Sequence, residues 1–319
     1  MKKARENWID QIKILACILV ALGHFFQSMC TAGILDAGLV YQWFNRTIYY
    51  FHVPLFFICS GYVYQKYSKV NSSIEWGKNA LKKLIALGVP YFVFSVITWV
   101  MKIVFSGDVN SNVHSLAYDL LVHPMSPYWY LFSIFFIFLI TPTFTNKKNC
   151  CLTLVLAFLL KILSEMLDYY ALKIIIGNQI WFVVGMSVCY FDFTETAKKY
   201  KLWAYILAGA FLFLSIWELE HLSFLMGLLA CGAILILFVN VCDIPSTLAE
   251  YTMPIFLMHT IFAAGVRVVL LKIGIDTPII HIIMGLGASF IGPIIAAELM
   301  KKLKLDILYQ PSKYIRIKK

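Results

Sequence analysis

The sequence predicts an all-α, polytopic integral membrane protein with about ten transmembrane helices and both termini in the cytoplasm. Three observations predict this fold: the composition, the recurrence of long apolar runs, and the distribution of basic residues. Of the 319 residues, 61% are hydrophobic and only 14% are charged, whereas about a quarter of the residues in soluble domains are charged. The mean hydropathy is +0.79. A chain this apolar is suited to lipid, and the composition therefore excludes a soluble globular domain.

Apolar runs of about the length needed to cross the hydrocarbon core recur along the whole chain. With their flanks they predict helices at Trp8–Ser28, Val40–Tyr64, Leu81–Phe105, Tyr128–Thr145, Cys150–Glu165, Leu172–Tyr190, Leu202–Trp217, Leu222–Val241, Ser246–Leu271 and Pro278–Met300. The first run is too long for a typical signal-peptide core and has no small-residue cleavage site. We therefore expect it to be retained as a membrane anchor.

The distribution of basic residues tests this assignment, because cytoplasmic loops are enriched in Lys and Arg. Twenty of the 27 basic residues fall on one side: Lys2, Lys3, Arg5, Lys66, Lys69, Lys78, Lys82, Lys83, Lys147, Lys148, Lys198, Lys199, Lys201 and seven from Lys301 to Lys319. The opposite side has only Arg46, Lys173 and Lys272. This asymmetry predicts that both termini are cytoplasmic, and an even number of helices follows.

The same pattern bounds the domain organisation and the partners. We expect one transmembrane domain over residues 1–300 and a basic cytoplasmic tail over 301–319 that rests on anionic lipid. The net charge of +10 does not indicate a nucleic-acid partner, because the basic residues occur in short patches between apolar runs. The eight cysteines lack the paired C-x-x-C and His spacing of zinc sites, so we interpret them as packing residues and expect no metal site.

Ionisable residues at membrane depth are candidate functional residues, because burying a charge in lipid costs several kcal/mol. The first predicted helix contains Asp10, Lys13 and His24. The rise from Lys13 to His24 is roughly 16 Å over nearly three turns, so the two side chains lie near opposite membrane faces but on one side of the helix. They could line one passage. The alternative is that Lys13 extends to the interface beside Asp10 and His24 only hydrogen-bonds a neighbouring helix.

The second predicted helix carries Arg46 and His52, followed by Pro54 and the pair Ser60-Gly61. A Pro and a Ser-Gly pair favour a kink with freed backbone groups, which lipid penalises unless protein or a cavity satisfies them. We therefore expect a kinked helix beside a cavity. The sequence is equally compatible with His52 as an ordinary interfacial residue.

Two further groups of polar residues are candidates for a functional role. His259 and Arg267 fall in the ninth predicted helix. The spacing from His114 to Asp119 matches the H-x-x-x-x-D pattern of glycerolipid acyltransferases. Seven His and nine Asp in 319 residues produce such a pair by chance about 0.2 times, so we interpret this spacing as accidental.

Six segments occur in an order that is typical of one family. They are Trp8 to Lys13 with His24, Phe51 to Gly61, Lys82-Lys83 before Val89-Pro90-Tyr91, Tyr128 to Leu131, Ile180 to Met186, and Tyr251 to His259. On these segments the chain resembles, over nearly its whole length, the acyltransferase-3 family of bacterial membrane proteins, and within it the fucose-O-acetylase-like branch. Members of this family O-acylate surface carbohydrates, and their ten helices with cytoplasmic termini agree with the topology predicted above.

The resemblance implies roles for particular residues. In the family, a basic residue and a His on the first helix, with ten residues between them, mark the site, and the His is taken as essential for acyl transfer. Here these residues are Lys13 and His24. The family usually has Arg at the first position, and Lys13 cannot make the bidentate phosphate contact of an Arg. The paired arginines of the family's third helix appear here as Lys82 and Lys83, so we expect Lys13, Lys82 and Lys83 to neutralise the phosphates of the donor.

The expected reaction moves an acetyl or other short acyl group from cytoplasmic acyl-CoA to a hydroxyl of a cell-surface or lipid-linked glycan. Acetyl-CoA is the expected donor, and no permanently bound cofactor is expected. His24 is the expected catalytic residue, because a positioned imidazole can take the proton of a hydroxyl near neutral pH. The candidate acceptor-binding residues are Arg46, His52 and Arg267, supported by Asp10 and His259.

The expected location is the bacterial cytoplasmic membrane, crossed several times. Some relatives carry an appended extracytoplasmic esterase-like domain that completes the transfer, so here we expect either direct transfer or a separate extracytoplasmic partner. The alternative function is a transporter or exporter of a polar solute or glycan, since polar groups that line a membrane passage also suit solute movement.

Overall fold

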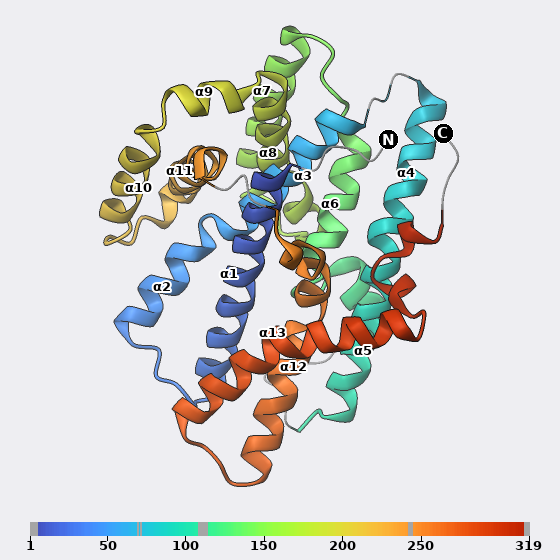
Figure 1. Ribbon diagram of the computed structural model, residues 1–319, viewed down its shortest axis with the longest axis vertical. Helices are drawn as coiled ribbons and strands as arrows, with labels where there is room; N and C mark the ends of the chain where they lie inside the picture. The colour runs from blue at the N-terminus through green and yellow to red at the C-terminus, as the bar shows by residue number, and fades with distance from the viewer. Residues whose placement is uncertain (1–5, 69, 71, 108–113, 242–244, 316–319) are drawn as a thin grey trace.

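Helices make up all the regular secondary structure in the computed structural model, which describes residues 6–68, 70, 72–107, 114–241 and 245–315 (Figure 1). The elements are α1 Asn7–Thr31, α2 Leu39–Tyr49, α3 His52–Tyr67, α4 Ser73–Lys83, η1 Leu84–Gly88, α5 Val89–Val104, η2 Tyr118–Val122, α6 Trp129–Ile140, α7 Lys147–Ser164, α8 Tyr170–Tyr190, α9 Phe193–Lys199, α10 Trp203–Leu214, η3 Glu220–Leu222, α11 Ser223–Val241, η4 Thr247–Glu250, α12 Thr252–Lys272, α13 Pro278–Lys302, η5 Asp306–Leu308 and η6 Pro311–Lys313. The all-α prediction is confirmed for these residues.

Six of the described helical stretches are long and apolar enough to cross a membrane, so the chain is a membrane protein. They are α1, the continuous stretch Ser73–Val104, α8, α11, α12 and α13. Two further apolar helices, α6 and α10, have 12 residues each, which is shorter than the roughly 20 residues that a span requires. The count of ten spans therefore stays a prediction.

The second predicted helix is wrong as a single element, because the chain breaks at Tyr50 and Phe51 into α2 and α3. The helix α3 is continuous through both Pro54 and Gly61, and the expected kink stays a prediction. Pro54 lies in the first turn of α3, where a backbone N–H has no partner within the helix and its loss costs nothing. The break precedes the proline instead of following from it.

Gly61 lies at a close contact between α3 and α8. A Cβ on Gly61 would lie 1.9 Å from the carbonyl oxygen of Phe182, and a Cβ on Gly185 would lie 1.9 Å from that of Ile58. The two backbones approach at two points, as is typical of small residues at interfaces between membrane helices. Buried side chains of both helices, such as Ile58 and Phe182, belong to the largest apolar cluster, which also includes Ile9 and Ile12 of α1.

Helix ends that the charge pattern assigned to one side meet in the structure. Glu6, at the start of α1, forms an ion pair with Lys66 at the end of α3. Gln65 exchanges hydrogen bonds of 3.1 and 2.9 Å with the backbone of Phe144 just before α7. Asn240 at the end of α11 donates to the carbonyl oxygen of Ala197 in α9 over 3.0 Å. This grouping agrees with the predicted topology, while its assignment to the cytoplasm stays a prediction.

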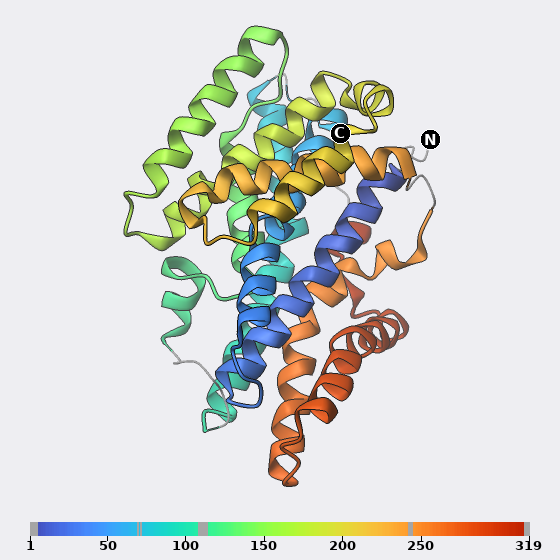
Figure 2. The ribbon, with the colours of Figure 1, turned by 90° about the vertical axis from the view of Figure 1, so that its left-hand side faces the viewer.

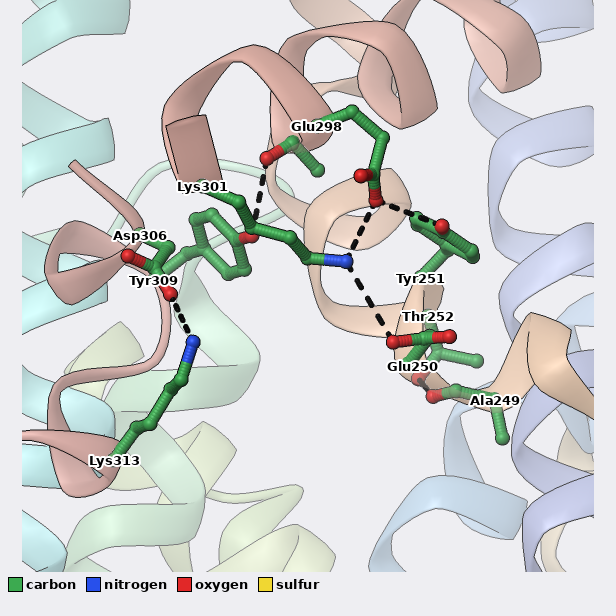
Figure 3. Close-up of polar contacts among 10 residues, drawn as sticks. Ala249, Glu250, Tyr251, Thr252, Glu298, Lys301, Asp306, Tyr309 and Lys313 are labelled. Carbon is green, nitrogen blue, oxygen red and sulfur yellow. Dashed lines mark hydrogen bonds and ion pairs between the residues drawn. The ribbon is translucent and has the colours of Figure 1, made fainter. Parts of the chain in front are cut away.

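The described part of the basic tail folds back onto the helices. Lys301 lies between Glu298 and Glu250 (Figure 3). Its Nζ is 2.6 Å from Oε1 of Glu298 and 3.6 Å from Oε2 of Glu250, and Tyr251 donates to Glu298 over 2.8 Å. Further along, the inaccessible Asp306 accepts a bond of 2.7 Å from Lys313. The described tail therefore packs on η1, α5 and α13, and Lys301 pairs with Glu250 of η4. Residues 316–319 lie outside the described chain.

The helix α1 lies at the centre of the arrangement that holds the site. It packs against α3 on one side and against α12 and α13 on another, and α11 crosses it (Figures 1 and 2). In Figure 1 the C-terminal ends of α1, α5 and α12 all point to the lower part of the molecule. The site is built from these three ends.

Candidate functional site

A cavity of about 720 Å³ lies between the C-terminal halves of α1, α5 and α12. Residues of the segment 114–126, which lies between α5 and α6 in the chain, also line it. Its polar and charged lining consists of His24, Gln27, Ser28, Thr31, Thr98, Lys102, His114, Asp119, His123, Ser126, His259, Thr260 and Arg267. A volume of this size is in the range of small-molecule sites.

Two imidazoles face each other in this cavity. The ring centroids of His24 and His259 are 5.5 Å apart, with 35° between the ring planes. Nε2 of His24 also lies 3.4 Å from Oγ of Ser126, a residue 102 positions away in sequence. The fold thus brings the predicted catalytic residue together with groups from α12 and from the segment 114–126.

The surroundings of His259 fix which ring nitrogen carries the proton. Nδ1 of this buried ring lies 2.9 Å from the carbonyl oxygens of both Ile255 and Phe256. Carbonyl oxygens only accept hydrogen bonds, so Nδ1 is the donor and Nε2 of the neutral ring is an acceptor. Among the described residues, buried Nε2 has no hydrogen-bond partner. It is therefore an acceptor beside His24 that lacks a donor.

Arg267 lies further along α12, and its side chain is 5% exposed. It lines the same cavity and donates from Nη1 to Oγ of Ser28, one turn after His24 on α1. Within the described chain, no ion pair joins Arg267 to a carboxylate. Arg267 and His24 therefore line one cavity, while the role of Arg267 in binding the acceptor stays a prediction.

The spacing that we interpreted as accidental is a contact in the structure. Nδ1 of His114 lies 3.5 Å from Oδ1 of the buried Asp119, and both line the cavity. Trp99 holds the backbone here by donating to the carbonyl oxygen of His114 over 2.9 Å. Lys102, which also lines the cavity, interacts electrostatically with Asp119. The H-x-x-x-x-D spacing was the one signal in the sequence that pointed to these residues.

The predicted donor-binding lysines do not line this cavity. Lys13 lies three turns before His24 on α1 and interacts electrostatically with Cys59 of α3. Nζ of Lys83 lies 3.7 Å above the ring of Phe138 on α6, and Lys82 precedes it at the end of α4. Asp10, in the first turn of α1, is also outside the lining.

Two of the three candidate acceptor-binding residues also lie outside the cavity lining. Arg46 donates from Nη1 to Glu218 over 2.9 Å and from Nη2 to the carbonyl oxygen of Ser215 over 3.3 Å, which ties α2 to the end of α10. His52 is buried, and its Nδ1 lies 2.6 Å from the carbonyl oxygen of Ile48. Of the three, Arg267 alone belongs to the described lining.

Comparisons with known proteins bear on the chemistry of this cavity. A family model described as an acyltransferase domain matches residues 6–298. Among curated proteins, the chain is similar to "Nodulation protein NolL" of Mesorhizobium japonicum, with 25% identity over 154 residues; the match covers 48% of this chain and 39% of that protein. No solved structure matches. Because the family model covers nearly the whole chain and the fold is a bundle of membrane helices, the chain belongs to the acyltransferase-3 family of membrane acyltransferases.

Proposed function

We propose that the protein transfers an acetyl or other short acyl group from acyl-CoA to a hydroxyl of a cell-surface or lipid-linked glycan. One observation carries this proposal: His24 faces a cavity of about 720 Å³ and has beside it an imidazole of fixed tautomer. Membership of an acyltransferase family supplies the reaction class. The choice of acyl group and of acceptor is part of the proposal.

In the proposed reaction, His24 is the base and His259 positions it. His24 is proposed to donate a hydrogen bond from one ring N–H to Nε2 of His259 and to keep that proton, so that its other nitrogen has a free lone pair for the acceptor hydroxyl. As the acceptor hydroxyl attacks the thioester carbonyl, His24 takes the hydroxyl proton. The C–O bond forms as the C–S bond breaks, the leaving thiolate of CoA takes the proton back from His24, and the product is an ester.

The donor is proposed to reach His24 along α1 from the end that holds Lys13. Lys13, Lys82 and Lys83 are proposed to neutralise the phosphates of acyl-CoA as point charges. The thioester must then cover the roughly 16 Å of rise between Lys13 and His24, a stretch of α1 that the described cavity lining does not include. The acceptor enters from the opposite end of α1, where the cavity lies. With the predicted cytoplasmic termini, we propose that the donor binds from inside and the glycan from outside a bacterial cytoplasmic membrane.

The test compares ester-linked acyl groups on surface glycans from cells that carry the wild type or His24→Ala, with equal membrane expression confirmed. We expect the esters to be lost in His24→Ala and retained in His221→Ala, which removes an exposed imidazole from η3, outside the cavity lining. Unchanged acylation in His24→Ala would contradict the proposal. Loss of solute flux with intact esters would favour the transporter instead.

A further inference from the structure

Arg267 is a buried cation whose charge the described protein does not balance. Its side chain is 5% exposed within an apolar helix, and a charged group at such a depth costs several kcal/mol unless it is paired. Its described partner is Oγ of Ser28, a neutral group. A guanidinium has five N–H donors, and this bond to Ser28 uses one of them.

The other charges in the cavity do not fill this role. Asp119 is the acidic residue of the described lining. It lies 3.5 Å from His114 and interacts electrostatically with Lys102. With Lys102 and Arg267 both cationic, the lining carries two permanent positive charges against one carboxylate. The positive charge left over is that of Arg267.

The position of Arg267 relates this charge to the reacting groups. Ser28 lies four residues after His24, which corresponds to about 6 Å of rise along α1. Arg267 lies eight residues after His259, which corresponds to about 12 Å along α12. The guanidinium therefore lies one to two turns from the paired imidazoles, on the side of the cavity away from Lys13. It is not near the end proposed for the phosphates of the donor.

We propose that the acceptor carries an anionic group, a sugar carboxylate or a phosphate, which Arg267 binds while His24 acts on a hydroxyl one to two helical turns away. This inference rests on the proposed function and names the acceptor class for the same cavity. The planar guanidinium can present two parallel N–H donors to a carboxylate or phosphate. A neutral sugar leaves the buried charge uncompensated, so acidic acceptors bind in preference to neutral ones.

The experiment measures binding of three soluble probes to the purified full-length protein in detergent: glucose, glucuronic acid and glucose 1-phosphate. A charge-assisted hydrogen bond contributes about 1.5–3 kcal/mol, so at least one anionic probe should bind at least about tenfold more tightly than glucose. Arg267→Gln should abolish this preference, and Arg267→Lys should retain only part of it. Lys272→Gln, which removes one exposed positive charge from the end of the same helix outside the lining, should leave the preference unchanged.

The outcomes separate this inference from the proposed function. Preference for glucuronic acid alone assigns the anion to the sugar, and preference for glucose 1-phosphate alone assigns it to a phosphate as in a lipid-linked sugar. Equal binding of all three probes overturns the inference, as does a preference that survives in Arg267→Gln. Acyl transfer from acetyl-CoA is assayed in parallel: transfer to neutral and acidic probes alike refutes only the acceptor class, whereas anion-selective binding without any transfer refutes only the enzyme.

Discussion

Replacing Gly61 with Ala tests the closest packing contact described for α3. The added Cβ would lie 1.9 Å from the carbonyl oxygen of Phe182 and 2.8 Å from its carbon, whereas real Cβ atoms essentially never approach within 3.0 Å. The two helices would have to separate by about 1.1 Å at this point, the difference between 3.0 and 1.9 Å. The obstructing atoms belong to the backbone of α8, so no change of rotamer can relieve the contact.

Overpacking of a core typically lowers the free energy of unfolding by about 1–3 kcal/mol. Because the obstructing atoms are backbone atoms, we expect Gly61→Ala to destabilise the protein by about 3 kcal/mol. The control is Gly209→Ala on α10, where an added Cβ meets nothing within 4 Å. Since Ala is favoured over Gly in a helix by about 0.5–1 kcal/mol, the control should be neutral or slightly stabilising. The assay heats the purified protein in detergent and measures the fraction that stays monodisperse, which gives the thermal midpoint. Equal midpoints for the two variants would refute the reasoning.

Three further changes test the site and the tail. His259→Phe keeps a ring but removes the nitrogen that is proposed to accept a hydrogen bond from His24. Because such a bond to a charged group contributes about 1.5–3 kcal/mol, kcat for acyl transfer should fall about 10- to 150-fold. A change only in the KM for the glycan substrate would contradict this role. Hydrogen bonds from Lys313 and Tyr314 hold the pKa of Asp306 in the folded protein below its ordinary value of 3.8. These bonds therefore stabilise the folded protein fully above pH 3.8, and their contribution is lost as the pH falls through the lowered pKa of Asp306. The thermal midpoint of Asp306→Asn should therefore be below that of the wild type at neutral pH, and the difference should shrink below about pH 4; a difference independent of pH would count against the pair. Arg46→Gln should lower the free energy of unfolding by at most about 1 kcal/mol, since the side chain of its partner Glu218 is 78% exposed and exposed ion pairs contribute little. Acyl transfer should not change. Reduced transfer at normal stability would indicate that Arg46 binds the acceptor.

Features governed by local periodicity could be predicted from the sequence. The apolar runs predicted α1, α8, α11 and α13 to within a few residues, because these helices are long and lack internal breaks. The side of α1 shared by Lys13 and His24 follows from 3.6 residues per turn. The break before α3 could not be predicted in this way, because Pro54 is disruptive inside a helix and neutral in its first turn. Which case holds depends on where the helix begins.

The composition of the cavity depends on tertiary packing and could be predicted only in part. Arg46 and Arg267 are both single arginines in predicted helices, and the sequence treats them alike. In the structure Arg46 has an acidic partner from a distant helix end, while Arg267 faces the cavity. His114 and Asp119 match a motif whose spacing chance explains equally well. They line the same cavity as His24 only because of the conformation of the segment 114–126, which local periodicity does not determine.

The helix α13 contributes no residue to the described cavity lining, yet its packing fixes the two helices that carry the imidazoles. A Cβ on Gly285 would lie 2.4 Å from the ring of Phe25, the residue after His24, and a Cβ on Gly292 would lie 2.5 Å from the ring of Phe262, three residues after His259. The two glycines are seven residues apart and therefore lie on one face of α13. A turn of one residue about the axis of α1 or α12 would rotate its imidazole by about 100° and would drive the adjacent phenyl ring out of its place against α13. The orientation of His24 toward His259 is thus set by small residues on a third helix that cannot be recognised as part of the site from its chemistry.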